Sequence, residues 1–218
     1  MTATSDTAAV EPAAALPLGR TEANASPVNH LWRLDDGRQT MVITATGERL
    51  PQVVYWGTRL PEAEDLRTLH GASMIDVTGG MLDENPDLSL CPEASRTFPG
   101  QPGLIVRRKD GTPLLPKFCF DSYTNGSDLQ IKYRDEANGL TLTFEFVTDP
   151  DTYMIQARTI LNADAPVHLH WLAAPVVPAP QASDEMIDFT GRWCGEFQTN
   201  RTAWSPGIRY RENRTGRT

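Results

Sequence analysis

Leu140-Thr141-Leu142-Thr143-Phe144-Glu145-Phe146-Val147 is the stretch that decides the fold. Large apolar side chains alternate with threonine and glutamate along it, and successive side chains of a β-strand point to opposite faces of a sheet. One face of this segment is therefore apolar and the other is polar, as expected for a half-buried strand. We predict a β-strand here, with its apolar face turned toward the core.

Turn signals on either side of this strand divide the flanking sequence into further short strands. Asn138-Gly139 and Asn125-Gly126 are dipeptides typical of β-hairpin turns, so residues 117–147 are predicted to form a three-stranded antiparallel meander. Helical periodicity is scarce, and this spacing of apolar runs and turns favours an all-β antiparallel sandwich. The other expected strands are Thr40–Thr46, Val53–Trp56, Tyr153–Leu161 and Val167–Ala174.

Residues 58–103 depart from this pattern, because repeated prolines and the Gly79-Gly80 pair interrupt any ladder of strands. A loop of this length inside a compact domain is more often functional than idle. A short helix is expected over Pro61–Leu69, since Glu62, Glu64 and Asp65 would favour its N-terminal turn.

Composition narrows the class of protein. A chain of 218 residues suits one sandwich-sized domain, and no apolar run is long enough to cross a bilayer. The net charge of −8 argues against a nucleic-acid partner, because it would repel phosphates. Arginines do gather near the C-terminus. An RNA-binding arm is one interpretation of that cluster, although a solvated strand or an arginine-rich domain joint is commoner.

The cysteines and the N-terminus bear on the compartment. Cys91, Cys119 and Cys194 are an odd number at wide spacing, which suits free thiols in a reducing compartment. Residues 1–28 lack both the cationic start and the apolar core of a signal peptide, and their Ala, Thr and Pro content predicts a disordered leader. We expect a cytoplasmic protein with a β-sandwich domain at 29–218, and no metal or other cofactor.

Two motifs near the C-terminus carry a family resemblance. Gly191, Trp193 and Glu196 form a Gly-x-Trp-x-x-Glu segment, and Glu212-Asn213-Arg214-Thr215-Gly216-Arg217-Thr218 follows it. The pair resembles the N-terminal β-domain of glycoside hydrolase family 36, the α-galactosidases. Weaker similarity occurs at Val54-Tyr55-Trp56-Gly57, and at Leu90-Cys91-Pro92-Glu93 with residues 98–104, so that the resemblance covers roughly residues 30 to 218.

The resemblance implies a fold and a function. The fold would be an antiparallel β-sandwich of the galactose mutarotase-like supersandwich type, incomplete at its C-terminal edge. In this family, two catalytic carboxylates lie in a (β/α)8 barrel that is C-terminal to the resembling region. The resemblance therefore implies a domain or fragment of an α-galactosidase-like enzyme that acts on terminal α-galactosides. It also implies a homo-oligomer, and no catalytic residue or catalysis within this chain alone.

Three residues are candidates for substrate binding. The resemblance places Trp193 at the galactose pocket, where an aromatic ring can stack on the apolar face of the sugar; the alternative is a core tryptophan. Trp56 would line the same pocket or a subunit contact, or would serve in packing. Asp76 is the candidate acceptor for sugar hydroxyls, with Asp83 as the other candidate, although most loop aspartates cap turns.

Other residue patterns suggest rival functions. Asp149 and Asp151 resemble a glycosidase pair, but aspartates that flank a proline are expected to be held by the turn and to face solvent. His168 and His170 share one strand face as metal ligands would, yet no third ligand lies within sequence reach, which favours an exposed polar face. A free-standing carbohydrate-binding or interaction module is the rival class. Catalysis by loop carboxylates is a third interpretation.

Overall fold

The computed structural model describes residues 28–74, 88–179, 183–205 and 209. Several positions singled out from the sequence lie outside the described residues. They are residues 1–27 of the expected leader, Asp76, Asp83 and the motif at residues 212–218.

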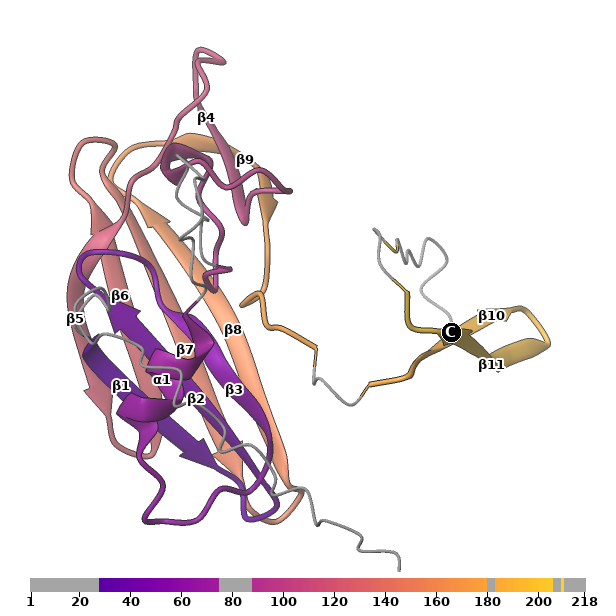
Figure 1. Cartoon of the computed structure of the whole chain (residues 1–218). Helices are drawn as coiled ribbons and strands as arrows, with labels where there is room; N and C mark the ends of the chain where they lie inside the picture. The colour runs from indigo at the N-terminus through magenta and orange to yellow at the C-terminus, as the bar shows by residue number, and fades with distance from the viewer. Residues whose placement is uncertain (1–27, 75–87, 180–182, 206–208, 210–218) are drawn as a thin grey trace, which may run out of the picture.

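Two antiparallel sheets form the body of the protein (Figure 1). The first has the order β1-β2-β3 and consists of β1 (Val28–Asp35), β2 (Gln39–Thr46) and β3 (Gln52–Thr58). The second has the order β5-β6-β7-β8 and consists of β5 (Cys119–Asn125), β6 (Asp128–Asp135), β7 (Leu140–Asp149) and β8 (Met154–Ala163). The predicted meander is confirmed as β5-β6-β7, and the all-β antiparallel class is confirmed with it.

Strand β7 shows the alternation that its sequence predicts. Leu140, Leu142, Phe144 and Phe146 are fully buried, whereas Glu145 on the opposite face is only half-buried. β7 pairs with β6 over Leu140–Val147 and with β8 along its whole length, so its apolar residues lie in the middle of the sheet. The apolar face can then lie wholly within the core, which is the main stabilising term in folding.

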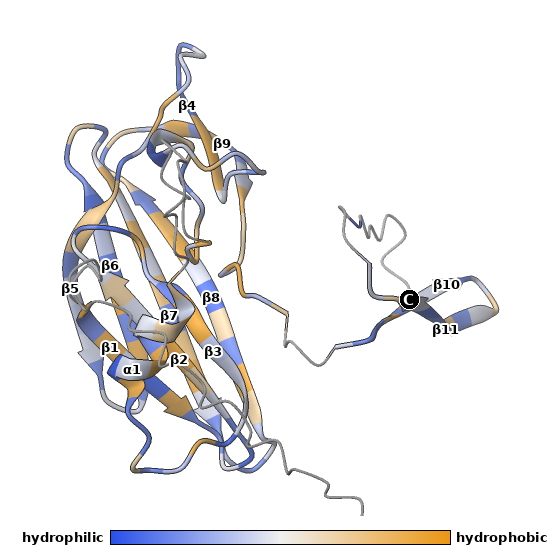
Figure 2. Ribbon diagram, in the orientation of Figure 1, coloured by the Kyte–Doolittle hydropathy of each residue, from blue (hydrophilic) through white to orange (hydrophobic). Residues whose placement is uncertain are grey.

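The core lies between the two sheets, and each sheet contributes one apolar face to it. Trp32 and Ile43 come from the first sheet, and Ile131 and Phe144 come from the second; all four belong to one buried cluster. Figure 2 shows hydrophobic residues alternating with hydrophilic ones along the strands of both sheets. One contiguous core is the usual sign of a single domain.

Two smaller strand pairs complete the described fold. A two-stranded ribbon pairs β4 (Leu104–Arg108) with β9 (Val167–Leu172). A hairpin is formed by β10 (Glu185–Arg192) and β11 (Gly195–Ala203), and Figure 1 shows it standing apart from the two sheets. Ile187 and Phe189 on one face of the hairpin are exposed, whereas Met186 and Asp188 on the other face are half-buried.

The helix in the segment after β3 begins later than predicted. Helix α1 spans Leu66–Ser73, not Pro61–Leu69, because Asp65 is its N-cap. The Asp65 carboxylate accepts hydrogen bonds from the backbone N–H groups of Arg67 and Thr68, as an N-cap does. Glu62 and Glu64 consequently precede the helix and do not form its first turn.

The second half of the same segment is part of the packed body. Leu90 is fully buried, and its N–H donates to Pro51 O while its carbonyl accepts from Val176 N. Residues 94–96 form a short 3-10 helix. The described portion of 58–103 is thus ordered by backbone hydrogen bonds to other segments of the chain, and only residues 75–87 of it lie outside the description.

Within the part of the chain that the structure describes, no helix is long and apolar enough to span a bilayer.

Candidate functional site

Trp193 lies at the turn of the β10–β11 hairpin. Arg192 pairs with Gly195 across the end of the ladder, so Trp193 and Cys194 make the connection, and Cys194 takes a φ of 60°. The Trp193 side chain is 73% exposed. It is therefore not a core tryptophan in this chain, and its indole ring is accessible to a partner or ligand.

The same hairpin carries an apolar surface, which the sequence analysis did not identify. Phe189 and Phe197 meet edge to face with ring centroids 6.3 Å apart, and both are more than half exposed. Ile187 shares their face of the hairpin, because residues two apart on a strand point the same way. In the sequence, apolar Ile187 and Phe189 alternate with polar residues, which is a pattern typical of a strand with one apolar face. This stretch was not predicted as a strand.

Trp56 is held in a fixed position on β3. Its ring packs against the main core while remaining half-buried, and its Nε1 donates to Gln39 Oε1 at 2.8 Å. Tyr55, the preceding residue, donates its hydroxyl to Thr58 O at 2.7 Å. The Tyr-Trp-Gly motif is thus a rigid strand end, and packing is the role that these contacts support for Trp56.

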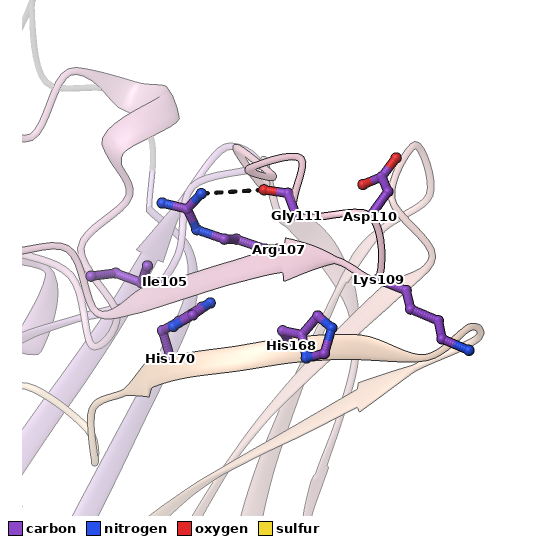
Figure 3. Close-up of a pocket in the computed structure, with 7 residues that line it drawn as sticks. All are labelled: Ile105, Arg107, Lys109, Asp110, Gly111, His168 and His170. Carbon is purple, nitrogen blue, oxygen red and sulfur yellow. Dashed lines mark hydrogen bonds between the residues drawn. The ribbon is translucent and has the colours of Figure 1, made fainter.

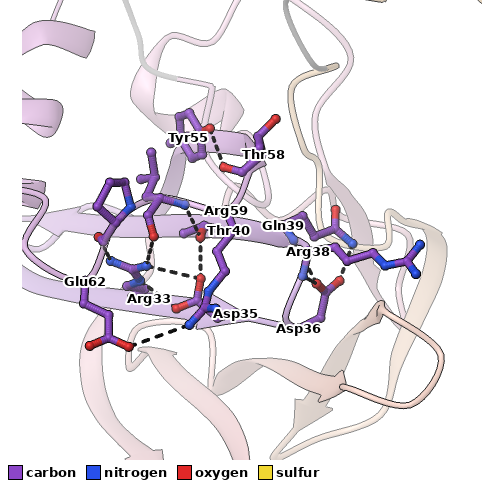
Figure 4. A network of polar contacts seen from close by, with 12 residues as sticks. Arg33, Asp35, Asp36, Arg38, Gln39, Thr40, Tyr55, Thr58, Arg59 and Glu62 are labelled. Atoms are coloured by element: carbon purple, nitrogen blue, oxygen red, sulfur yellow. Dashed lines mark hydrogen bonds and ion pairs between the residues drawn. The ribbon is translucent and has the colours of Figure 1, made fainter.

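The buried carboxylate of Asp36 fixes the position of the Gln39 side chain. Asp36 has no exposed surface, and it accepts hydrogen bonds from Arg38 N and Gln39 N at 2.9 Å each and from Gln39 Nε2 at 2.5 Å (Figure 4). Burial raises the pKa of Asp36, but these hydrogen bonds outweigh burial and the net pKa is lowered. The carboxylate therefore stays ionised and orients the amide that holds Trp56.

A second polar network fixes the start of the segment that follows β3. The Arg33 guanidinium donates to Leu60 O at 2.6 Å and to Pro61 O at 2.8 Å, and it pairs with Asp35 at 2.7 Å (Figure 4). Thr40 connects the same network to Leu60, whose N–H donates to the Thr40 hydroxyl at 3.0 Å. The chain leaving β3 toward Asp76 is therefore anchored at its first residues.

The two described candidates for sugar binding, Trp56 and Trp193, lie on separate parts of the chain. Trp56 lies on β3, in the body of the protein, and Trp193 lies on the hairpin that Figure 1 shows apart from it. Asp76, the third candidate, lies outside the described residues. Sugar binding by these three residues stays a prediction.

Glu93, from the motif at residues 90–93, has a structural role. Its carboxylate accepts from Phe118 N at 2.8 Å and pairs with Arg96 Nε at 2.9 Å, and it is almost completely buried. Burial raises the pKa of Glu93 despite these contacts. The residue joins the 3-10 helix to the strand region that leads into β5.

The carboxylate pair at the β7–β8 turn is held as predicted. Asp149 accepts from Asp151 N at 2.9 Å and from the Thr152 hydroxyl at 2.7 Å, and the Thr152 hydrogen bond is the main cause of its lowered pKa. Asp151 is exposed. Asp149 is held by hydrogen bonds within its own turn and Asp151 is exposed, so this turn gives no support to catalysis by loop carboxylates.

The remaining predicted features also have defined positions. His168 and His170 are both exposed on β9, and no group of three potential metal-binding side chains occurs among residues 28–74, 88–179, 183–205 and 209. The predicted free thiols are confirmed, with Cys91 buried and Cys194 exposed.

Comparison with solved structures establishes the architecture. The chain is similar to the α-galactosidase AgaA A355E of Geobacillus stearothermophilus in complex with 1-deoxygalactonojirimycin, with a TM-score of 0.69 and 17% identity over 86% of this chain and 30% of that one. It is also similar to an α-galactosidase from Lactobacillus brevis, with a TM-score of 0.65 and 15% identity over 81% of this chain and 28% of that one. At these identities the likeness shows the fold, which is that of a β-domain within a larger glycosidase.

Sequence comparison then identifies the family. The profile described as the glycosyl hydrolase family 36 N-terminal domain matches residues 49–218, and the chain belongs to that family. An α-galactosidase of Escherichia coli is 26% identical over 198 residues, which are 88% of this chain and 26% of the relative. The chain thus spans about a quarter of the length of that relative.

Proposed function

We propose that this chain serves as the N-terminal β-domain of an α-galactosidase that hydrolyses terminal α-galactosides during carbohydrate catabolism. The family match over residues 49–218 and the fold shared with α-galactosidases support this proposal. The catalytic carboxylates would belong to a barrel domain outside these residues. The chain itself would supply binding surface, and the intact enzyme would be a homo-oligomer.

The exposed indole of Trp193 is the observation that carries the binding role. A tryptophan that is 73% exposed at a hairpin turn presents a flat apolar surface, and the same hairpin carries the exposed Phe189 and Phe197. Such rings stack on the apolar faces of sugars at low conformational cost. Solved complexes of AgaA contain raffinose and stachyose, and these are the galactosides that we propose as ligands here.

A free-standing carbohydrate-binding module is the second candidate, favoured by the core that lies between the two sheets. Such a module would bind raffinose without any catalytic domain. The domain proposal expects weak or no binding by the chain alone, because Trp56 and Trp193 lie on separate parts of it (Figure 1).

Two measurements on the 218-residue chain separate these functions. Calorimetric titration with raffinose should show no saturable binding if the chain needs its catalytic domain, and clear binding if it is an independent module. Assay with a nitrophenyl α-galactoside should show no turnover. The assay uses a purified preparation, with the Trp193→Ala variant as a control. Turnover by this chain would overturn the proposal in favour of catalysis by the chain's own carboxylates.

We also propose a cytoplasmic location, supported by the free thiols. Cys194 is exposed and Cys119 is partly exposed, and exposed thiols persist in a reducing compartment. Thiol labelling in intact cells after fractionation tests this location. Recovery of the protein with oxidised cysteines from an extracellular fraction would contradict it.

A further inference from the structure

A groove with basic side chains lies on the β4–β9 ribbon, away from the residues that the proposed function uses. It has a volume of about 560 Å³, and its lining includes Arg107, Lys109, His168 and His170. Figure 3 shows the Arg107 side chain and the two imidazoles on neighbouring strands, with the Asp110 carboxylate set apart at the loop tip. The ribbon lies at one end of the body (Figure 1). The β7–β8 turn, where Tyr153 O accepts from Gln39 Nε2, lies at the other end.

Strand pairing brings the basic side chains together. Arg107 lies directly opposite His168 in the β4–β9 register. Lys109 lies in the turn directly after β4, and His170 lies between Leu169 and Trp171, where the register of the ribbon shifts. Arg108 points to the other face. Pairing of β4 with β9, together with the turn after β4, places these basic groups around one groove.

These charges have no ion-pair partner among the described residues of the chain. Arg107 donates only to a neutral acceptor, Gly111 O, at 3.2 Å. Asp110 is the one acid in the lining, and it accepts from Thr112 N at 2.9 Å within its own turn.

We propose that this groove binds a tetrahedral oxyanion, of the kind carried by sulfate, free phosphate or a sugar phosphate. The Arg107 guanidinium offers paired N–H donors that match such an anion, and Lys109 adds a point charge. The imidazoles of His168 and His170 add ring N–H donors beside them. In a chain of net charge −8, a local group of basic residues also concentrates anions at this position.

The proposal predicts two features of anion binding by the 218-residue chain. Sulfate is the first probe, because it is a stable tetrahedral dianion at neutral pH. Titration at constant ionic strength, with chloride as the balancing salt, should show saturable binding. Arg107→Gln and His168→Gln should each weaken binding about fivefold.

A matched pair of variants separates the effect of the groove on sulfate binding from the effect of net charge. Lys109→Gln and Lys132→Gln delete the same charge, but Lys132 is exposed on β6, outside the groove. Sulfate binding should weaken for the first variant and stay unchanged for the second. Thermal unfolding without anion checks that each groove variant folds as the parent chain does.

Comparison of ligands then identifies the source of the oxyanion. Free phosphate, a hexose phosphate and the same hexose without phosphate are titrated against the parent chain. Tighter binding of the hexose phosphate indicates a sugar ligand, and equal binding indicates the inorganic ion. The proposal is wrong if sulfate does not bind above the chloride background, or if the groove variants bind it as well as Lys132→Gln does.

Discussion

Asp36→Ala is expected to destabilise the protein by about 2–3 kcal/mol, because it leaves three hydrogen-bond donors without their acceptor. Those donors are Arg38 N, Gln39 N and Gln39 Nε2. Each lost acceptor costs about 1–3 kcal/mol when the donor stays buried. Gln39 Nε2 also donates to Tyr153 O at 3.2 Å, so the loss falls mainly on the two backbone N–H groups and, at the lower end of that range, is about 2–3 kcal/mol in all. For a domain of this size the loss corresponds to a melting temperature about 4–12 °C lower.

Urea or thermal unfolding followed by circular dichroism measures this effect. Asp151→Ala is the matched control, since Asp151 is exposed and is expected to change stability by less than about 0.5 kcal/mol. Asp36→Asn should lie between the two, because it keeps one carbonyl acceptor. Equal stability of Asp36→Ala and Asp151→Ala would refute the argument that this carboxylate organises the turn.

The same carboxylate predicts a pH dependence. Hydrogen bonding lowers the pKa of Asp36 in the folded protein below its unfolded value, which is about 3.9. Its stabilisation is then fully present above the unfolded pKa and is lost as the pH falls through the folded pKa. The stability difference between the parent chain and Asp36→Ala should therefore be constant from pH 7 to about pH 5 and should shrink below about pH 4.

Three further substitutions or reactions test the packing. Gly103→Ala should cost about 1–3 kcal/mol in urea unfolding, because its Cβ would lie 2.6 Å from Cys91 Sγ and 2.8 Å from Cys91 Cα; an unchanged unfolding midpoint would contradict this. Burial raises the pKa of Cys91 to about 12, so mass spectrometry after brief alkylation should find Cys194 modified and Cys91 intact. Trp56→Phe should cost about 1 kcal/mol, because Gln39 Oε1 loses its indole donor; a neutral result would show that this hydrogen bond contributes nothing net.

The sequence predicted the strands whose two faces differ. Along β7, apolar and polar residues alternate strictly, and burial of one face is what such a pattern specifies. The Asn-Gly pairs likewise located both turns of the β5-β6-β7 meander. Helix α1 was misplaced because acidic residues favour a helix N-terminus in general, whereas a cap requires one carboxylate to reach two particular N–H groups, as Asp65 does.

The candidate site was only partly predictable. The exposure of Trp193 depends on its place in a hairpin turn, and neighbouring residues do not reveal whether a glycine-flanked tryptophan is in a turn or in a core. The groove on β4–β9 depends on a pairing between residues that lie far apart in the chain, which no local pattern specifies. His168 and His170 were correctly placed on one exposed face, but their neighbour Arg107 could not be foreseen.

The most direct test of the proposed role is the effect of Trp193→Ala on raffinose hydrolysis by the intact enzyme that carries this chain as its N-terminal domain. Trp171→Ala is the control, because Trp171 is also exposed but lies on β9. We predict a rise of roughly tenfold in KM for Trp193→Ala, from the loss of an aromatic stacking surface, and no change for Trp171→Ala. Identical KM and kcat values for the two variants would contradict the assignment of Trp193 to the galactoside site.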